Sequence, residues 1–410
     1  MNTEEKKKRI GQVLDSFKIE HSQMQSIVGT SLTLFEFKPA IGTKLSKIRN
    51  LKDEFTVALE AESVRIIAPI PGRGTVGIEV PHKKKEILPM AEILNSPEYL
   101  TADMQLPVAL GKTITGEVFI KDLADMPHLL VAGATGQGKS VGLNVMLMSL
   151  LHKKTPEELT LVLIDPKQVE LSVYNDILGK YGWGGKVITE ADEVETTLRY
   201  LYLLMENRYK LFDCVGCRNI KEYYEKKGKT GVPYVVVVID EYADLIMQDN
   251  GKKIEKQICM LAQKARAVGI HLIISTQRPS ATIVTGNIKA NFPTRIAFRT
   301  TTGTDSRVIL DNTGAEKLTG NGDMLYFAGA ETARVQCAYI DMKDVENSLD
   351  EINKIYEDFE AGEEFEKGNN PFDFINKEDG IIKLLKFTMV IYEMTKEGIK
   401  FQLKLKVYTS

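Results

Sequence analysis

Residues 129–142 read LLVAGATGQGKSVG, and this stretch decides the fold. Within it, Gly133 to Ser140 matches GxxxxGK[ST], the pattern of a loop whose backbone N–H groups enclose a phosphate. The apolar run before the loop, Leu129 to Ala132, is typical of a buried strand. The run after it, Val141 to Leu151, is typical of a buried helix. Because the motif requires a strand, a loop and a helix in this order, a chance glycine-rich turn is the weaker interpretation.

The residues of this loop have distinct roles in the prediction. Lys139 reaches the β- and γ-phosphates of ATP, and Ser140 holds Mg²⁺ through its hydroxyl. The N-terminus of the following helix adds positive potential. The predicted nucleotide-binding residues are Gly133, Ala134, Thr135, Gly136, Gln137, Gly138, Lys139, Ser140 and Val141.

A second polar position follows the apolar run Tyr234 to Ile239. Five consecutive β-branched residues are typical of a central parallel strand, and α/β folds bind ligands at the carboxyl ends of such strands. We therefore predict that Asp240 holds Mg²⁺ through water and that Glu241 is the general base for the attacking water. The Asp-Glu pair alone is weak evidence, and a phosphate loop upstream strengthens it.

Two further candidates come from the next helix and strand. A helix is predicted over residues 252–268, and Arg266 lies off its apolar stripe, so its guanidinium is free to reach another site. The run His271 to Gln277 is typical of a buried strand with a polar end. Gln277 could sense the γ-phosphate or order the water, or it could be an ordinary polar strand terminus.

The composition excludes several classes of protein. The chain has 410 residues, enough for two or three domains, and a net charge of −3, so any DNA-binding surface must be local. The charged N-terminus is no secretory signal, and no apolar run has the length of a membrane helix. Four cysteines without secretory context indicate a reducing compartment. Cys214 and Cys217 have CxxC spacing, for which helix packing is favoured over a metal or redox role.

The predicted fold class is α/β, with a mostly parallel sheet covered by helices on both faces. We expect a leader over residues 1–20, a small α+β domain over 21–115, an ATPase domain over 116–345 and an atypical acidic and lysine-rich tail over 346–410.

Several long runs resemble the motor region of the FtsK/SpoIIIE family of bacterial DNA translocases. They include PHLLVAGATGQGKSVGLNVMLMSLL, LVLIDPKQVELSVY, VVVVIDEYADLIM, LAQKARAVGIHLIISTQRPS and DSRVILDNTGAEKLTGNGDMLY. The resemblance covers roughly residues 20–345, with the motifs in the same order. It implies a small N-terminal domain, a RecA-like ATPase domain with ATP and Mg²⁺, and a homo-oligomeric ring, a hexamer. It also implies that the ring moves double-stranded DNA during chromosome segregation at cell division or sporulation.

The resemblance also suggests residues that act on a neighbouring subunit or on DNA. An arginine finger of the family falls on the LAQKAR run, which points to Arg266; Arg278, Arg295 and Arg307 are the other candidates. The family's DNA channel loops lie on the motor domain, and here residues 279–289 could line the channel. Arg278, Thr282 and Lys289 would then hold phosphates without reading bases.

Two departures from the family pattern leave alternatives open. The sequence shows no membrane-spanning segment, and this leaves two expectations. Either the chain works in the cytoplasm, where membrane-associated division machinery could recruit it, or it is a fragment or a separately encoded motor. Residues 346–410 do not look like the winged-helix domain that reads orienting sequences. A conjugation or mobile-element transfer ATPase of the same superfamily is the second interpretation, and a truncated chain that only binds nucleotide is the third.

Overall fold

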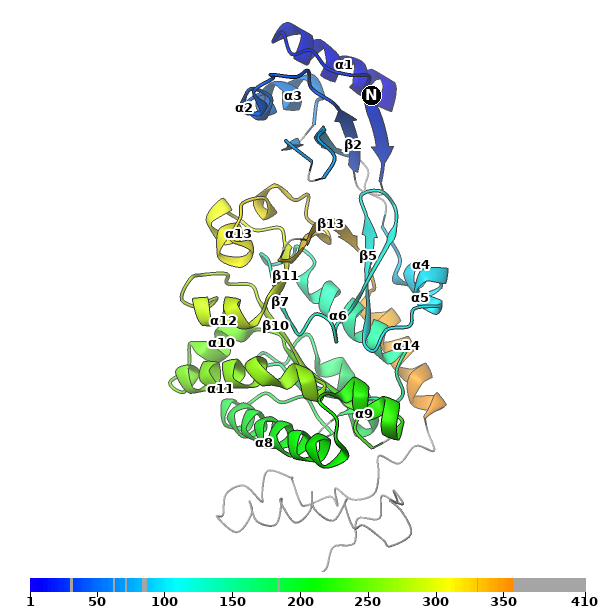
Figure 1. Cartoon of the computed structure of the whole chain (residues 1–410), viewed down its shortest axis with the longest axis vertical. Helices are drawn as coiled ribbons and strands as arrows, with labels where there is room; N and C mark the ends of the chain where they lie inside the picture. The colour runs from blue at the N-terminus through cyan, green and yellow to red at the C-terminus, as the bar shows by residue number, and fades with distance from the viewer. Residues whose placement is uncertain are drawn as a thin grey trace, which may run out of the picture.

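The computed structural model describes residues 1–356 apart from 30–31, 62, 71, 83–86, 183–184, 230 and 330. These residues form a small N-terminal unit and a large unit that follows it along the long axis of the molecule (Figure 1). The predicted acidic and lysine-rich tail lies outside the described residues from position 357 onward.

The small unit is a four-stranded antiparallel sheet with the strand order β1-β2-β4-β3. Its strands are β1 (Gln25–Val28), β2 (Leu32–Phe37), β3 (Arg65–Ile67) and β4 (Val76–Pro81). Its helices are α1 (Thr3–Ser16), α2 (Leu45–Arg49) and α3 (Lys52–Ala58). Ile10 and Leu14 of α1 are buried in the same core as Phe55 of α3. Helix α1 is therefore part of this unit, although the sequence predicts a separate leader over residues 1–20.

The large unit contains a nine-stranded sheet with the order β6-β5-β13-β12-β11-β7-β10-β9-β8. The strands from β11 to β8 are parallel to one another, and the strands from β12 to β6 pair in antiparallel fashion. The parallel strands are β7 (His128–Ala132), β8 (Leu159–Ile164), β9 (Tyr234–Ile239), β10 (Ile270–Thr276) and β11 (Thr294–Phe298). The fold is thus the predicted α/β class, with an antiparallel flank added to the parallel core.

The antiparallel flank begins before the predicted domain boundary. It consists of β5 (Pro107–Thr113), β6 (Val118–Asp122), β12 (Asp323–Ala328) and β13 (Glu331–Cys337). From the sequence we predict that residues up to 115 belong to the small domain. In the structure, however, β5 pairs with β13 and β6 in the large sheet. The large unit therefore starts upstream of residue 116.

Helices cover both faces of the parallel strands (Figure 1). One face carries α6 (Lys139–Leu151), α7 (Asn175–Tyr181) and α14 (Met342–Ile355), and α14 contacts both α6 and α7. The other face carries α8 (Ala191–Val215), α10 (Tyr242–Ile246), α11 (Gly251–Lys264) and α12 (Gly286–Asn291). The shorter helices are α4 (Met90–Leu94), α5 (Pro97–Leu100), α9 (Ile220–Lys227) and α13 (Gly303–Leu310). Among the described residues, none of the helices combines the length and the apolar character needed to cross a bilayer.

Candidate active site

The predicted phosphate loop lies between the end of β7 and the start of α6. Gly138 caps the helix with a φ of 110°, in the left-handed region that disfavours side chains. A Cβ added at Gly138 would lie 2.8 Å from backbone atoms of Gly322, so the close approach of the two segments also requires glycine. Position 138 therefore requires glycine both for its backbone conformation and for its contact with Gly322, and the loop ends at the N-terminus of α6, where an anion is favoured.

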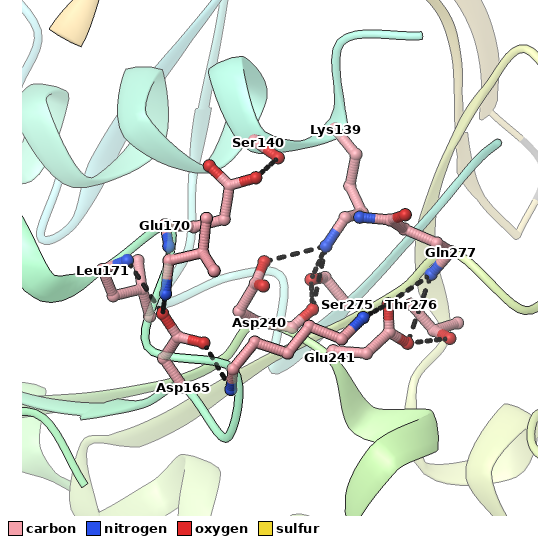
Figure 2. A network of polar contacts seen from close by, with 12 residues as sticks. Lys139, Ser140, Asp165, Glu170, Leu171, Asp240, Glu241, Ser275, Thr276 and Gln277 are labelled. Atoms are coloured by element: carbon pink, nitrogen blue, oxygen red, sulfur yellow. Dashed lines mark hydrogen bonds and ion pairs between the residues drawn. The ribbon is translucent and has the colours of Figure 1, made fainter. Parts of the chain in front are cut away.

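Lys139 is the buried cation of the site (Figure 2). Its Nζ atom donates to Asp240 Oδ1 at 2.8 Å, to the Asp240 carbonyl at 2.9 Å and to Ser275 Oγ at 3.1 Å. Asp240 follows β9, and Ser275 lies on β10, the strand between β9 and β7. The loop lysine and the strand-end acid therefore lie at one edge of the sheet, which we call the carboxyl edge because β7, β9 and β10 end there.

Glu241 is fully buried beside this pair and is held in a fixed orientation. Its Oε1 accepts a hydrogen bond from Thr276 Oγ1 at 2.6 Å, and its Oε2 accepts one from the Gln277 amide at 3.0 Å. The Gln277 side chain accepts a hydrogen bond from Thr135 Oγ1 of the phosphate loop at 2.6 Å. Glu241 and Gln277 therefore lie together beside Thr135 of the phosphate loop.

Two acids that the sequence analysis does not assign also lie at this edge. Ser140 Oγ donates to Glu170 Oε1 at 2.6 Å, from the loop that follows β8. Asp165, at the end of β8, accepts hydrogen bonds from five backbone amides, those of residues 167–171, and thereby fixes that loop. The available signal is the apolar strand that ends in Asp165, the same pattern that identifies Asp240.

The oxygen donors here fit Mg²⁺. The Ser140 hydroxyl and the carboxylates of Glu170 and Asp240 are hard ligands, and Mg²⁺ in nucleotide sites is held by one or two protein oxygens together with phosphates and waters. Lys167 adds a cation from the same loop, 3.2 Å from Asp244 and 3.9 Å from Glu241. The arrangement can thus accommodate an anionic ligand with its counterion, and the Glu241 carboxylate can serve as a proton acceptor.

Arg266 lies away from this site in its own chain. It belongs to a 3₁₀ turn, Ala265–Val268, which precedes β10, while Thr276 at the other end of β10 reaches the site. Its side chain is exposed, and of the residues that the structure describes, none forms a hydrogen bond or ion pair with its guanidinium. At about 3.3 Å per strand residue, the two ends of β10 are about 20 Å apart, beyond the reach of an arginine side chain.

The other arginine candidates differ in their surroundings. Arg295 is buried and donates to carbonyls of Phe292, Lys289 and Ile309 and to Asp311. Its guanidinium is committed to these contacts, so Arg295 stabilises the fold, which argues against its candidacy as a finger. Arg278 and Arg307 are exposed.

The predicted DNA-contacting residues are only partly available. Lys289 forms an ion pair with Asp311 at 2.6 Å, and Asp311 also pairs with Arg295. Arg278 and Thr282 are both exposed, on the segment that leads from β10 to α12.

The two cysteines with CxxC spacing differ in their surroundings. Cys214 is exposed and Cys217 is buried in the core, in agreement with a packing role for the second cysteine.

The fold and site define a P-loop ATPase of the RecA-like class. A model of the FtsK/SpoIIIE family matches residues 89–281, and a model of the FtsK alpha domain matches residues 1–82. The DNA translocase FtsK of Haemophilus influenzae is 41% identical over 401 residues, which cover 89% of this chain and 75% of that protein. The chain belongs to the FtsK/SpoIIIE family.

Other relatives are longer than this chain. The DNA translocase FtsK of Treponema pallidum is 46% identical over 324 residues, 77% of this chain and 40% of that protein. For that of Caldanaerobacter subterraneus the identity is 42% over 381 residues, 92% of this chain and 53% of that protein. The chain thus spans about half the length of these relatives.

Solved structures share the fold. The pCW3 conjugation coupling protein TcpA, in a monomer form with ATPgS, superposes with a TM-score of 0.61 and 29% identity, covering 86% of this chain and 98% of that one. The cytoplasmic domain of the type VII secretion ATPase EccC of Thermomonospora curvata gives a TM-score of 0.56 at 21% identity, covering 65% of this chain and 34% of that one. The second likeness concerns the fold alone.

Proposed function

We propose that the chain binds ATP with Mg²⁺ on the phosphate loop and hydrolyses it. The observation that carries this proposal is the convergence of Lys139 and Glu241 at the carboxyl edge, from two strands with β10 between them. Lys139 would exchange its bond to Asp240 for the β- and γ-phosphates. Glu241, oriented by Thr276 and Gln277, would accept a proton from the attacking water.

The counterion has its own donors in this scheme. When bound, Mg²⁺ neutralises phosphate oxygens, and Ser140, Glu170 and Asp240 are the residues that would hold it directly or through water. Gln277 would orient the water or contact the γ-phosphate from its position beside Thr135.

The exposed position of Arg266 supports a site that two copies of the chain share. Because Arg266 cannot reach the phosphate loop of its own chain, it would stabilise the transition state in a neighbouring copy. A closed ring satisfies every site of this kind with one repeated, heterologous interface. The hexamer that the family resemblance implies is the ring size we propose.

The substrate that we propose to be moved is double-stranded DNA, because the FtsK relatives are named as DNA translocases. With a net charge of −3, the chain would grip phosphates through local cations such as Arg278 and through backbone N–H groups. We propose that it works in the cytoplasm in chromosome segregation, with membrane-associated division machinery as a partner. The likeness to TcpA favours, as a second candidate, a role in conjugative DNA transfer.

The test is steady-state ATP hydrolysis with and without long linear duplex DNA across a salt series. We expect strong stimulation by DNA, with an apparent DNA affinity that falls about 10³-fold or more between about 50 and 200 mM salt if six or more phosphates are held. Lys139→Ala is the control for contaminating hydrolysis. Hydrolysis that is indifferent to DNA would contradict the translocase proposal and leave the nucleotide site standing.

A further inference from the structure

Four charged side chains lie where the small unit meets the large one, and all of them except the partly exposed Arg65 are buried. Arg65 of β3 and Glu79 of β4 belong to the small sheet, and Asp323 of β12 and Arg334 of β13 belong to the large sheet. Arg334 donates to Glu79 through Nη1 and to Asp323 through Nε at 2.9 Å and Nη2 at 2.6 Å. Arg65 donates to both oxygens of Glu79 at 3.2 Å. We call these residues the interdomain quartet.

Glu79, Asp323 and Arg334 are almost fully removed from water, the Arg65 side chain is 21% exposed, and the four charges balance. Glu79 and Asp323 are each 1% exposed, and two guanidinium groups offset the two carboxylates. Burial alone would raise the pKa of Asp323, but the charge and hydrogen bonds of Arg334 and the hydrogen bonds of Thr319 lower it below its ordinary value. Such buried ionic groups often stabilise less than apolar residues of similar volume would, so a role in fixing one geometry is the better explanation.

At its other end the quartet holds a tight turn. Asp323 Oδ2 accepts hydrogen bonds from the Thr319 amide at 2.6 Å and from Thr319 Oγ1 at 2.9 Å. Between these two residues, Gly320, Asn321 and Gly322 all have positive φ, so the turn of residues 319–323 depends on outside contacts for its shape. Asp323 provides the contact at the base of this turn.

The turn packs directly on the phosphate loop. The Gly322 amide donates to the Gln137 carbonyl at 3.1 Å, and the backbones of Gly322 and Gly138 are in close contact. A continuous set of contacts therefore leads from Glu79 in the small unit, through Arg334 and Asp323, to the loop that would receive the phosphates.

We propose that Glu79 and Arg334 are positioning residues for ATP binding, through which the small unit fixes the 319–323 turn against the phosphate loop. This inference rests on the proposed function, because it assumes that nucleotide binds at that loop. By thermodynamic reciprocity, nucleotide on the loop also strengthens the docking of the small unit on the large one. ATP-dependent changes of the loop would reach the small unit by the same route.

The variant that tests the proposal most cleanly is Glu79→Gln in the full chain. It leaves Arg334 paired with Asp323, whereas Arg334→Met leaves the buried Asp323 without its cation and Glu79 with Arg65 alone. The matched control is Glu36→Gln. Glu36 is an almost buried acid of the same small sheet, but its partners, Arg73 and Thr75, belong to the small unit.

The measurement is the dissociation constant of a fluorescent ATP analogue with Mg²⁺. We expect Glu79→Gln to weaken binding about tenfold and Glu36→Gln to leave it at the wild-type value. If Arg334→Met folds, the double variant with Glu79→Gln should bind no more weakly than Arg334→Met alone. Wild-type affinity for Glu79→Gln, or equal losses for the two glutamate variants, would overturn the inference. A wild-type chain that binds no nucleotide would instead overturn the proposed function and the inference with it.

A second readout separates positioning from general stability. In the wild type, bound nucleotide should slow hydrogen exchange of the β4 amides next to Glu79, and in Glu79→Gln this protection should disappear while thermal unfolding of the chain stays cooperative. Equal nucleotide protection of β4 in both proteins would contradict the coupling.

Discussion

The two edges of the parallel sheet differ in how their polar groups are satisfied. At the carboxyl edge, buried charged side chains have hydrogen-bonding partners, as Lys139 has in Asp240 and Glu241 has in Thr276. The opposite edge, where the strands begin, we call the amino edge. Burial, assisted by the other histidine and by Arg266, lowers the pKa of His128 to about 3, and burial lowers that of His271 to about 4. Both histidines are therefore uncharged at neutral pH, and Arg266 is an exposed cation at this edge.

This difference indicates a division of labour. In the proposed function, the carboxyl edge supplies the donors and acids for nucleotide binding and hydrolysis, and the amino edge presents a cation that cannot reach the phosphate loop of its own chain. If the two edges belong to one active site, they must come from different copies of the chain. The following predictions test this comparison in order of decreasing effect.

Removing the cation of the amino edge should have the largest effect. Arg266→Ala should lower kcat for ATP by about 10³-fold or more, because a trans-acting arginine stabilises charge in the transition state, while nucleotide binding stays close to wild type. Steady-state hydrolysis and a nucleotide-binding titration measure the two quantities. Arg218→Ala, at an arginine whose side chain is 89% exposed, is the control and should leave kcat unchanged. A wild-type kcat for Arg266→Ala would show that the amino edge takes no part in ATP hydrolysis.

Removing the carboxylate of the carboxyl edge should cost somewhat less. Glu241→Gln preserves the shape of the side chain but cannot accept the proton of the attacking water, so kcat should fall about 10²- to 10⁴-fold. Binding of a fluorescent ATP analogue should persist. Loss of binding together with hydrolysis would indicate that Glu241 holds the structure of the site and is no general base.

A smaller effect is expected for the acid next to Ser140. Glu170→Gln should raise the Mg²⁺ concentration needed for half-maximal hydrolysis by about tenfold, because Glu170 orients the Ser140 hydroxyl and, in the proposed site, would also orient waters of the bound ion. The control is Glu158→Gln, which changes an acid paired with Lys154 elsewhere on the large unit. An unchanged Mg²⁺ requirement for Glu170→Gln would confine Glu170 to fixing its own loop.

The smallest effect concerns the stability of the amino edge. Below pH 6.5 the unfolded chain protonates His128 and His271, whereas the folded chain does not until about pH 3 and about pH 4. Stability should therefore fall as the pH falls from 6.5, by up to about 1.4 kcal/mol per pH unit for each histidine. Urea unfolding at pH 7 and pH 5.5 measures this difference, and His271→Gln should reduce it by about 1 kcal/mol. If His271→Gln leaves the difference in unfolding free energy between pH 7 and pH 5.5 unchanged, the claim that His271 is buried in its uncharged form is contradicted.

Much of the carboxyl edge could be predicted from sequence because its residues follow apolar runs directly. The strands that end before Gly133, Asp240 and Gln277 are continuous in sequence and carry their functional residue at a fixed position. Periodicity is strong for such buried parallel strands, so the α/β class was also accessible.

The remaining parts depend on contacts between distant segments. The pairing of Glu170 with Ser140 and that of Glu79 with Arg334 join residues far apart in the chain, and no local pattern encodes them. The antiparallel strands β5 and β13 contain polar residues and alternate weakly, so the start of the large unit was placed too late. Helix α1 packs on α3 through two buried residues, Ile10 and Leu14. The rest of α1 is mostly charged, so its sequence resembles a separate leader.

The most direct test of a site shared between the two edges is a mixing experiment. Glu241→Gln and Arg266→Ala chains are each measured alone and then mixed, with DNA and ATP present. An interface that combines the intact carboxyl edge of one variant with the intact amino edge of the other should hydrolyse ATP. We therefore expect activity in the mixture well above the sum of the two inactive proteins. A mixture as inactive as its components would contradict the shared site.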